Sequence, residues 1–121
     1  MTDGSFVASA TRVADAGRRA CDAVEIAVRQ LEVATDAVAA GAPVLDVVDE
    51  LMAAGGRELR LDAASAFLAY EQAVASMRAT VVRILIDEDH LSLTDVAARL
   101  RVSRQAVKRL YALQPSDGSP G

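Results

Sequence analysis

Residues 104–109 bring together polar and basic side chains with no carboxylate among them: Arg104, Gln105, Lys108 and Arg109. Guanidinium and amide groups can form paired hydrogen bonds with the edges of bases, and basic side chains neutralise phosphate groups. Residues 92–114 carry five basic residues and one carboxylate, a net charge of +4, whereas residues 1–91 carry eight arginines and fifteen carboxylates, a net charge of −7. Although the whole chain has a net charge of −4, this asymmetry predicts a phosphate-facing segment on an acidic body.

The other side chains that could act in catalysis or bind a metal lack the partner residues that such sites need. His90 ends the sequence DEDH, but no second, spaced group of ligands accompanies it, which predicts a solvated loop and no metal site. Cys21 is the single cysteine and lies in an alanine-rich stretch, so we interpret it as a small packing residue. The sequence has no glycine-rich phosphate loop and no nucleophile elbow. We therefore expect neither an enzyme nor a bound cofactor.

Residues 92–113 have the pattern of two short helices joined by a tight turn. Ser92 is suited to cap the first helix, with Asp95 as the reciprocal partner in a capping box. In the turn, Val102 is expected to fill the corner and Ser103 to cap the second helix. The apolar positions expected to hold the two helices together are Val96, Ala97, Leu100, Val107 and Leu110.

This stretch, LSLTDVAARLRVSRQAVKRLYAL, resembles the helix-turn-helix superfamily of bacterial regulators, site-specific recombinases and sigma-factor-like domains. It departs from the family at Arg101, where the family favours glycine because the residue often needs a positive φ. The resemblance implies that the second helix enters the major groove of DNA, with Arg104 suited to guanine and Gln105 to adenine or a phosphate. Lys108 and Arg109 lie on the same face of that helix and are implied to contact DNA as well. The resemblance further implies contacts to phosphate or sugar by Thr94, Arg99, Arg101, Ser103 and Tyr111.

Residues 6–40 have strong helical character, with apolar or small residues at alternating intervals of four and three. This spacing indicates a seam against another helix, either a later helix of the same chain or the same helix of a second subunit. Gly41-Ala42-Pro43 is expected to end this helix, and a short amphipathic helix is expected over residues 43–54. The seam positions are Phe6, Ala10, Val13, Gly17, Ala20, Val24, Ala27, Leu31, Ala34 and Val38.

Gly55-Gly56 is expected to break the chain before a third helix. We expect that helix to begin near Leu61–Asp62, with Asp62 as its N-cap. It should end near residues 87–90, where the acidic run Asp87-Glu88-Asp89 favours a loop. Its inward-facing residues are expected to be Phe67, Tyr70, Val74, Met77, Val81 and either Ile84 or Leu85.

The sequence thus predicts an all-α fold, in which a helical hairpin or coiled-coil-like body precedes a three-helix helix-turn-helix head without a wing. Residues 1–60 form the body and a candidate dimerisation region, residues 61–91 a long connecting helix, and residues 92–113 the helix-turn-helix, with the head covering about 77–113. Residues 114–121 are rich in Pro, Gly and Ser and are expected to be disordered. No apolar run is long enough for a membrane helix and no signal-peptide pattern is present, so we expect a cytoplasmic protein with no membrane partner.

These features together predict a sequence-specific protein that binds double-stranded DNA, most simply a transcriptional regulator. A homodimer would present two heads to half-sites about 34 Å apart. Two alternatives stay open: a helical protein-interaction module whose helix-turn-helix corner does not bind DNA, and the DNA-binding part of a recombinase-like protein. No polar cluster in the sequence indicates an effector ligand.

Overall fold

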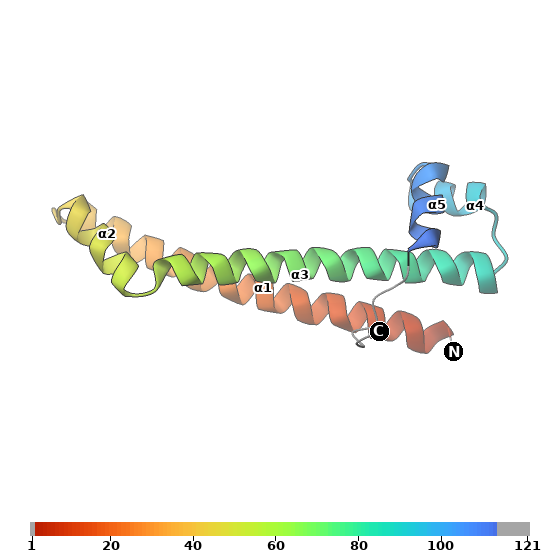
Figure 1. The fold of residues 1–121 in the computed structure, drawn as a ribbon, viewed down its shortest axis with the longest axis horizontal. Coiled ribbons are helices and arrows are strands. Elements are labelled where there is room, and N and C mark those ends of the chain that lie inside the picture. Colours follow the sequence, from red (N-terminus) through yellow and green to blue (C-terminus); the bar gives the residue numbers. More distant parts are fainter. Residues whose placement is uncertain (1, 114–121) are drawn as a thin grey trace. The chain divides into compact units, whose positions relative to one another are not determined.

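The computed structural model describes residues 2–113, with side chains from residue 4 onward, and every element in it is a helix (Figure 1). No strand occurs in this part of the chain, so the fold is all-α, as predicted. The prediction of a disordered tail concerns residues 114–121, which lie outside the described residues. The elements are α1 (Thr2–Ala39), α2 (Val44–Ala53), α3 (Gly56–Arg83), the π-helical segment η1 (Ile84–Glu88), α4 (Leu93–Leu100) and α5 (Arg104–Ala112).

Gly41 lies just beyond the end of α1 and supports the predicted stop. Its φ of 103° lies in the region that favours glycine, since a side chain there would meet the backbone. The amide of Ala42 donates to the carbonyl of Ala37 at 2.9 Å, which closes the C-terminal end of the helix. Pro43 then precedes α2 with φ of −62°, a value suited to the start of a helix.

α3 begins at Gly56, upstream of the predicted start near Leu61–Asp62. That prediction was wrong because one glycine of the pair is enough to separate the two helices: Gly55 takes φ of 83°, and Gly56 is already helical. The amide of Leu59 donates to the carbonyl of Gly55 at 3.0 Å and closes the first turn. Asp62 therefore lies inside the helix and not at its N-cap.

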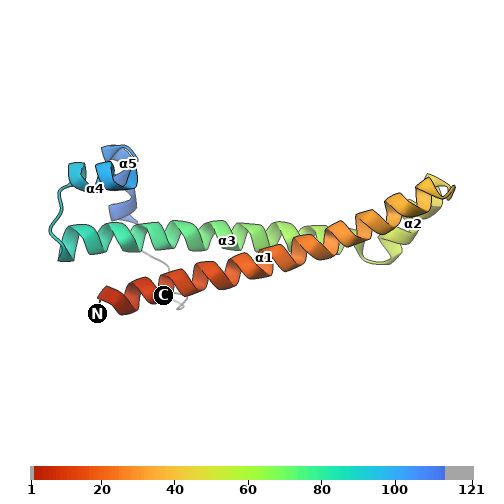
Figure 2. The ribbon, with the colours of Figure 1, turned by 180° about the vertical axis from the view of Figure 1, so that it is seen from behind.

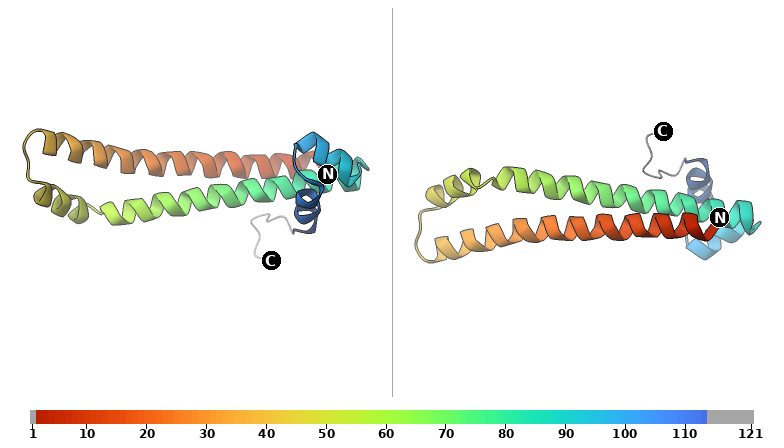
Figure 3. Two further views of the ribbon diagram at one scale, coloured as in Figure 1. Left: turned by 90° about the horizontal axis from the view of Figure 1, so that it is seen from above. Right: turned by 90° about the horizontal axis from the view of Figure 1, so that it is seen from below.

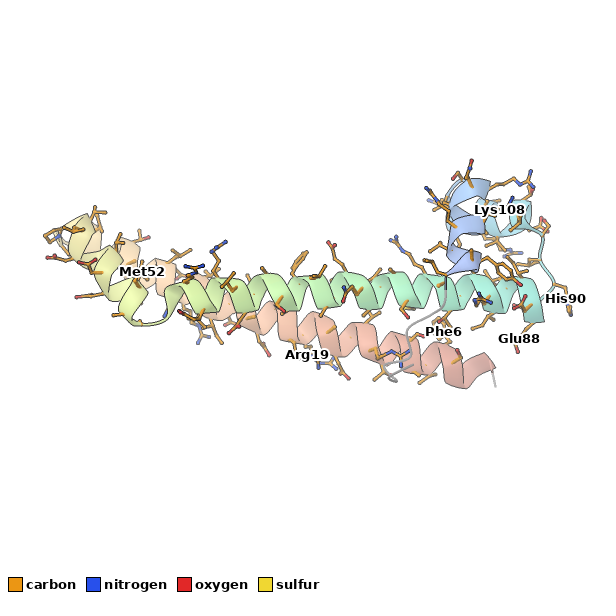
Figure 4. All side chains as sticks on the ribbon, in the orientation of Figure 1. Phe6, Arg19, Met52, Glu88, His90 and Lys108 are labelled. Carbon is orange, nitrogen blue, oxygen red and sulfur yellow. The ribbon has the colours of Figure 1, made fainter. Side chains whose placement is uncertain are left out.

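At its other end α3 passes at Arg83 into η1. The amide of Asp89 donates to the carbonyl of Ile84 at 3.1 Å, which is the five-residue spacing of a π-helix. Two residues of the acidic run, Asp87 and Glu88, are therefore helical, and the predicted loop begins only at Asp89. His90 follows in this loop with φ of 59° (labelled in Figure 4).

The chain divides into two compact units, one formed by residues 1–15 with 71–121 and the other by residues 16–70. The division falls inside α1 and α3, because both long helices contribute to each unit. The units therefore do not coincide with the ranges 1–60, 61–91 and 92–113 inferred from the sequence. No helix within residues 2–113 combines the length and the apolar character that crossing a membrane requires.

Small side chains mark the places where α1 and α3 come together as antiparallel neighbours (Figures 2 and 3). In the unit of residues 16–70, a Cβ added to Gly17 would lie 3.3 Å from Cε1 of Tyr70. In the other unit, the buried hydroxyl of Ser9 donates to Oγ1 of the buried Thr80 at 3.3 Å. Ala79 next to Thr80 is also buried. Both pairs need a small residue on α1, since a larger one would push the helices apart.

In the single chain, only some of the seam positions predicted on α1 are buried or half-buried. Of these positions, Ala20 is buried; Ala10, Val13, Gly17, Ala27 and Ala34 are half-buried; and Phe6, Val24, Leu31 and Val38 are exposed. The contacts with α3 follow the smaller side chains, so the larger ones are left outside. Phe67, predicted to face inward on α3, is likewise 51% exposed, whereas its neighbour Tyr70 is half-buried.

Candidate functional site

α4 begins with the predicted capping box. The hydroxyl oxygen of Ser92 accepts from the amide of Asp95 at 3.0 Å, and the carboxylate of Asp95 accepts from the amide of Ser92 at 3.3 Å. These bonds satisfy amides that have no partner inside the helix. They fix the start of α4 at Leu93 as the sequence predicted.

The turn between α4 and α5 depends on a left-handed residue. Arg101 has φ of 58° and ψ of 43°, and the amide of Val102 donates to the carbonyl of Ala97 at 3.1 Å. Ser103 then caps α5 by accepting from the amide of Ala106 at 3.0 Å, as predicted. Val102 is 42% exposed, so the expectation that it fills the corner was wrong. The left-handed conformation of Arg101 closes the turn without a contribution from the side chain of Val102.

A small apolar core holds the two helices against the end of α3. Val82 of α3, Val96 of α4 and Val107 of α5 are completely buried, and Ala97 is 6% exposed. Val96, Ala97 and Val107, which the sequence predicted to hold the two helices together, are thus all in this core. The surrounding half-buried residues are Leu85, Ile86, Leu91, Leu93, Leu100, Leu110 and Tyr111.

The other face of α5 carries the four residues with which the sequence analysis began: Arg104, Gln105, Lys108 and Arg109. All four are exposed, and within the described residues no hydrogen bond or ion pair of the chain engages their side-chain nitrogens (Lys108 is labelled in Figure 4). α5 contains no carboxylate that would neutralise them. We call these four residues the α5 face. Four further predicted contacts are exposed nearby in sequence: Thr94 and Arg99 on α4, and Arg101 and Ser103 in the turn.

Tyr111, the ninth predicted contact, bonds within the protein. Its hydroxyl donates to Oδ1 of Asp87 in η1 at 2.6 Å, and the guanidinium carbon of Arg83 lies 4.9 Å from the centre of its ring. The hydrogen bond to Asp87 and the negative charge of that carboxylate raise the pKa of Tyr111, while Arg83 acts in the opposite direction. Both Nε and Nη2 of Arg83 also donate to the carbonyl of Leu113, at 3.3 and 3.2 Å.

Arg83, Asp87 and Tyr111 thus form a latch between the C-terminal end of α5 and the end of α3. Arg83 satisfies a carbonyl just beyond α5 and stacks on the ring, and Asp87 holds the hydroxyl. Sequence reasoning missed Arg83 and Asp87, because they lie thirty and twenty-four residues from their partners. No local spacing relates residues so far apart.

A groove of about 720 Å³ lies beside this latch, within the same unit. Its apolar wall includes the exposed Val102 and Leu113, and two guanidinium-bearing residues, Arg78 and Arg109, also line it. Arg109 therefore borders both the α5 face and an apolar groove. Elsewhere in residues 4–113, no three His, Cys, Asp or Glu side chains gather as metal ligands would.

The sequence matches no protein-family model, and neither a curated protein nor a solved structure is significantly similar to the chain.

Proposed function

We propose that this protein binds double-stranded DNA in a sequence-specific manner, with α5 in the major groove, and that it regulates transcription as a homodimer. The observation that carries the proposal is the α5 face: a helix presenting three cationic side chains and one amide to solvent, with no carboxylate. Such a face suits a surface of phosphates and base edges.

The core behind α5 supports the same proposal. Readout of bases requires a helix that keeps its orientation, because a displacement of about 1 Å removes a hydrogen bond. Val107 anchors α5 from behind, Ser103 fixes its first turn, and the latch through Tyr111 fixes its last. The α5 face is thus held on a rigid support while its side chains are unengaged within the described chain.

The N-terminus of α5 adds to the attraction for phosphate. The amides of the first helical turn point outward and carry a partial positive charge, which favours an anion at that position. Arg104 is the first residue of α5, and Arg101 precedes it by three positions in the turn. Phosphate contacts there would set the position of the helix, and Arg104 with Gln105 would read bases.

Selection of bound duplexes from a random DNA library tests the proposal. We expect enrichment of a defined site, and a two-fold symmetric site if two heads bind together. Recovery of DNA without any preferred sequence would contradict specificity, and failure to recover DNA even at low salt would overturn the proposal altogether.

The exposed apolar residues of the groove beside α5 favour a second candidate function, a helical protein-interaction module. Val102 is 42% and Leu113 49% exposed, and both border the groove with Leu100 and Leu110. An amphipathic helix with acidic flanks would suit this groove and its two arginines. If Val102→Glu leaves DNA selection unchanged, the groove has no part in DNA binding; if DNA selection fails for the unaltered protein, this second function becomes the better proposal.

A further inference from the structure

A stripe of residues at intervals of four and three runs along α1, and it includes Gly17, Val24, Leu31 and Val38 of the predicted seam. It consists of Gly17, Cys21, Val24, Val28, Leu31, Thr35 and Val38, and we call it the outer stripe. Apart from the half-buried Gly17, all of its members are exposed in the single chain. Val24 is 41%, Val28 44% and Leu31 60% exposed.

The outer stripe borders a groove of about 890 Å³ within the unit of residues 16–70. Cys21, Val24 and Val28 line one side, and Phe67 and Tyr70 of α3 line the other. The rings of Phe67 and Tyr70 lie 6.3 Å apart, and Phe67 is half exposed. Five charged residues line the groove as well: Arg18, Asp22, Glu25, Arg29 and Glu32. Exposed apolar side chains gathered in this way are costly to leave in water, and in a folded protein they favour contact with another molecule.

We infer that a second copy of this chain covers the outer stripe, with its α1 antiparallel to the first. In this arrangement Val24 lies opposite the partner's Val28, and Cys21 lies opposite the partner's Leu31. A two-fold axis crosses between the two copies of α1, so each contact occurs twice. The inference adds a surface and an orientation to the dimer of the proposed function, and it can be tested without DNA.

Side-chain size favours the antiparallel orientation. The N-terminal part of the outer stripe is small, with Gly17 and Cys21, and the C-terminal part is larger, with Leu31 and Val38. Antiparallel pairing sets small residues against large ones along the seam, which fills space evenly. Parallel pairing would set Gly17 against Gly17 and Leu31 against Leu31, leaving a void at one layer and crowding at another.

Charge complementarity selects a copy of the same chain as the occupant. Arg18 directly follows the outer-stripe residue Gly17, and Glu32 directly follows Leu31. The antiparallel pair brings Arg18, which also interacts within its own chain, close to the partner's Glu32. Flanking charges of this kind set partner and orientation in helical pairs. The two Glu25 carboxylates approach each other near the two-fold axis. Each already accepts a hydrogen bond from Arg29 of its own helix at 2.6 Å, which reduces the repulsion between them.

Sedimentation of the full chain tests whether the outer stripe forms the dimer. We expect twice the chain mass at micromolar concentration, and a single chain mass for Val28→Glu, because each dimer would bury two unpaired carboxylates. Leu45→Glu is the matched control: Leu45 lies on α2, is 71% exposed and is not part of the outer stripe, so this variant should stay dimeric. A monomeric unaltered protein, or a folded Val28→Glu variant that remains dimeric, would overturn the inference.

Disulfide trapping tests the orientation, and it does so even if Val28→Glu fails to fold. In the antiparallel pair, Cys21 and the partner's Cys21 are about ten residues apart along the axis, or about 15 Å, too far for a disulfide. Leu31→Cys should give a covalent dimer under mild oxidation, through Cys21 and the new thiol. The unaltered protein should not form a covalent dimer, and neither should the double variant Leu31→Cys, Cys21→Ala. A covalent dimer of the unaltered protein indicates parallel pairing and contradicts the inference, as does a dimer that Leu31→Cys fails to trap.

Discussion

Arg101 occupies a backbone conformation that costs energy for any residue with a side chain. Its φ of 58° places the Cβ close to the following carbonyl, a strain of about 1–2 kcal/mol. The chain keeps an exposed arginine at this position, between α4 and α5. If α5 contacts phosphates, the positive charge of Arg101 beside the N-terminus of α5 would strengthen that contact and offset the strain.

Arg101→Gly should therefore stabilise the protein and weaken its binding to DNA. We expect a gain of about 0.5–1 kcal/mol in the free energy of unfolding, since relief of strain exceeds the greater freedom of glycine in the unfolded chain. Chemical denaturation measures the gain. Arg99→Gly is the control: it removes the same charge from the last turn of α4, where glycine relieves no strain, and should destabilise the protein by up to about 1 kcal/mol. Destabilisation by Arg101→Gly would contradict the account of the turn.

Arg104 and Gln105 are assigned to base edges, and their removal should reduce sequence preference. Arg104→Ala or Gln105→Ala should cost about 1–3 kcal/mol on the selected site and little on a scrambled duplex. The ratio of the two dissociation constants measures this effect. An equal loss on both duplexes would show that the residue contacts the DNA backbone instead.

We assign Lys108 and Arg109 to phosphates, so their loss should weaken binding to every DNA sequence alike. Lys108→Ala should lower the salt dependence of binding by about one unit and leave the sequence preference unchanged. Arg19→Ala, which removes an exposed cation from the unit of residues 16–70, should change neither quantity. A salt dependence that Lys108→Ala leaves unchanged would remove Lys108 from the interface.

At the scale of elements, the latch connects α5 to η1 through side chains. The hydrogen bond between Tyr111 and Asp87 requires the protonated phenol, and its pKa is raised above the ordinary value of about 10. The stabilisation is therefore fully present below about pH 10 and is lost as the pH rises through the raised pKa of the folded protein.

Titration of tyrosine absorbance checks this linkage. In a Tyr70→Phe background, Tyr111 should titrate above pH 10, and Asp87→Asn should shift its midpoint downward, because the carboxylate no longer accepts the bond or opposes the phenolate charge. If Asp87→Asn leaves the midpoint in place, the latch does not exist in solution.

The packing of α4 and α5 depends on very few buried side chains. Val107→Ala should destabilise the protein by about 1–3 kcal/mol, since Val107 is completely buried and its loss leaves a cavity. Val44→Ala is the control, because Val44 is 61% exposed and should change stability by less than about 0.5 kcal/mol. Thermal unfolding compares the two variants, and equal effects would contradict the assigned core.

The sequence was most informative where local chemistry decides the structure. The capping box at Ser92, the cap at Ser103 and the burial of Val107 are confirmed, and each follows from side chains within a few residues. The positive φ at Arg101 agrees with what the helix-turn-helix resemblance implied for that position. The latch, the early start of α3 and the exposure of Val102 were not predicted. They depend on contacts distant in sequence or on which of two adjacent glycines makes a turn, and neither leaves a local pattern.

At the scale of the whole molecule, the two signs of charge are distributed unevenly along the chain. Residues 92–114 carry a net charge of +4 and residues 1–91 a net charge of −7, while the outer stripe lies on α1 in the acidic part. If the protein binds DNA as proposed, the negative charge of residues 1–91 repels the phosphates and confines the contact to residues 92–114. The outer stripe, if it pairs two copies, would supply that segment twice.

Pairing through the outer stripe predicts that stability depends on protein concentration. The unfolding temperature of the unaltered protein should rise with concentration, because association stabilises the folded chain by mass action. Val28→Glu should abolish this dependence. An unfolding temperature that does not change over a hundredfold range of concentration would contradict dimerisation through this surface.

Fluorescence anisotropy of a labelled duplex, measured over a series of salt concentrations, tests the central proposal most directly. We expect the unaltered protein to bind the selected duplex with an affinity that falls linearly with salt on logarithmic axes. The combined variant Arg104→Ala, Gln105→Ala and Lys108→Ala, folded by circular dichroism, should lose both the preference for that duplex and most of the affinity. Binding by this variant equal to that of the unaltered protein would place the DNA contact elsewhere, and no binding by either at low salt would refute DNA binding itself.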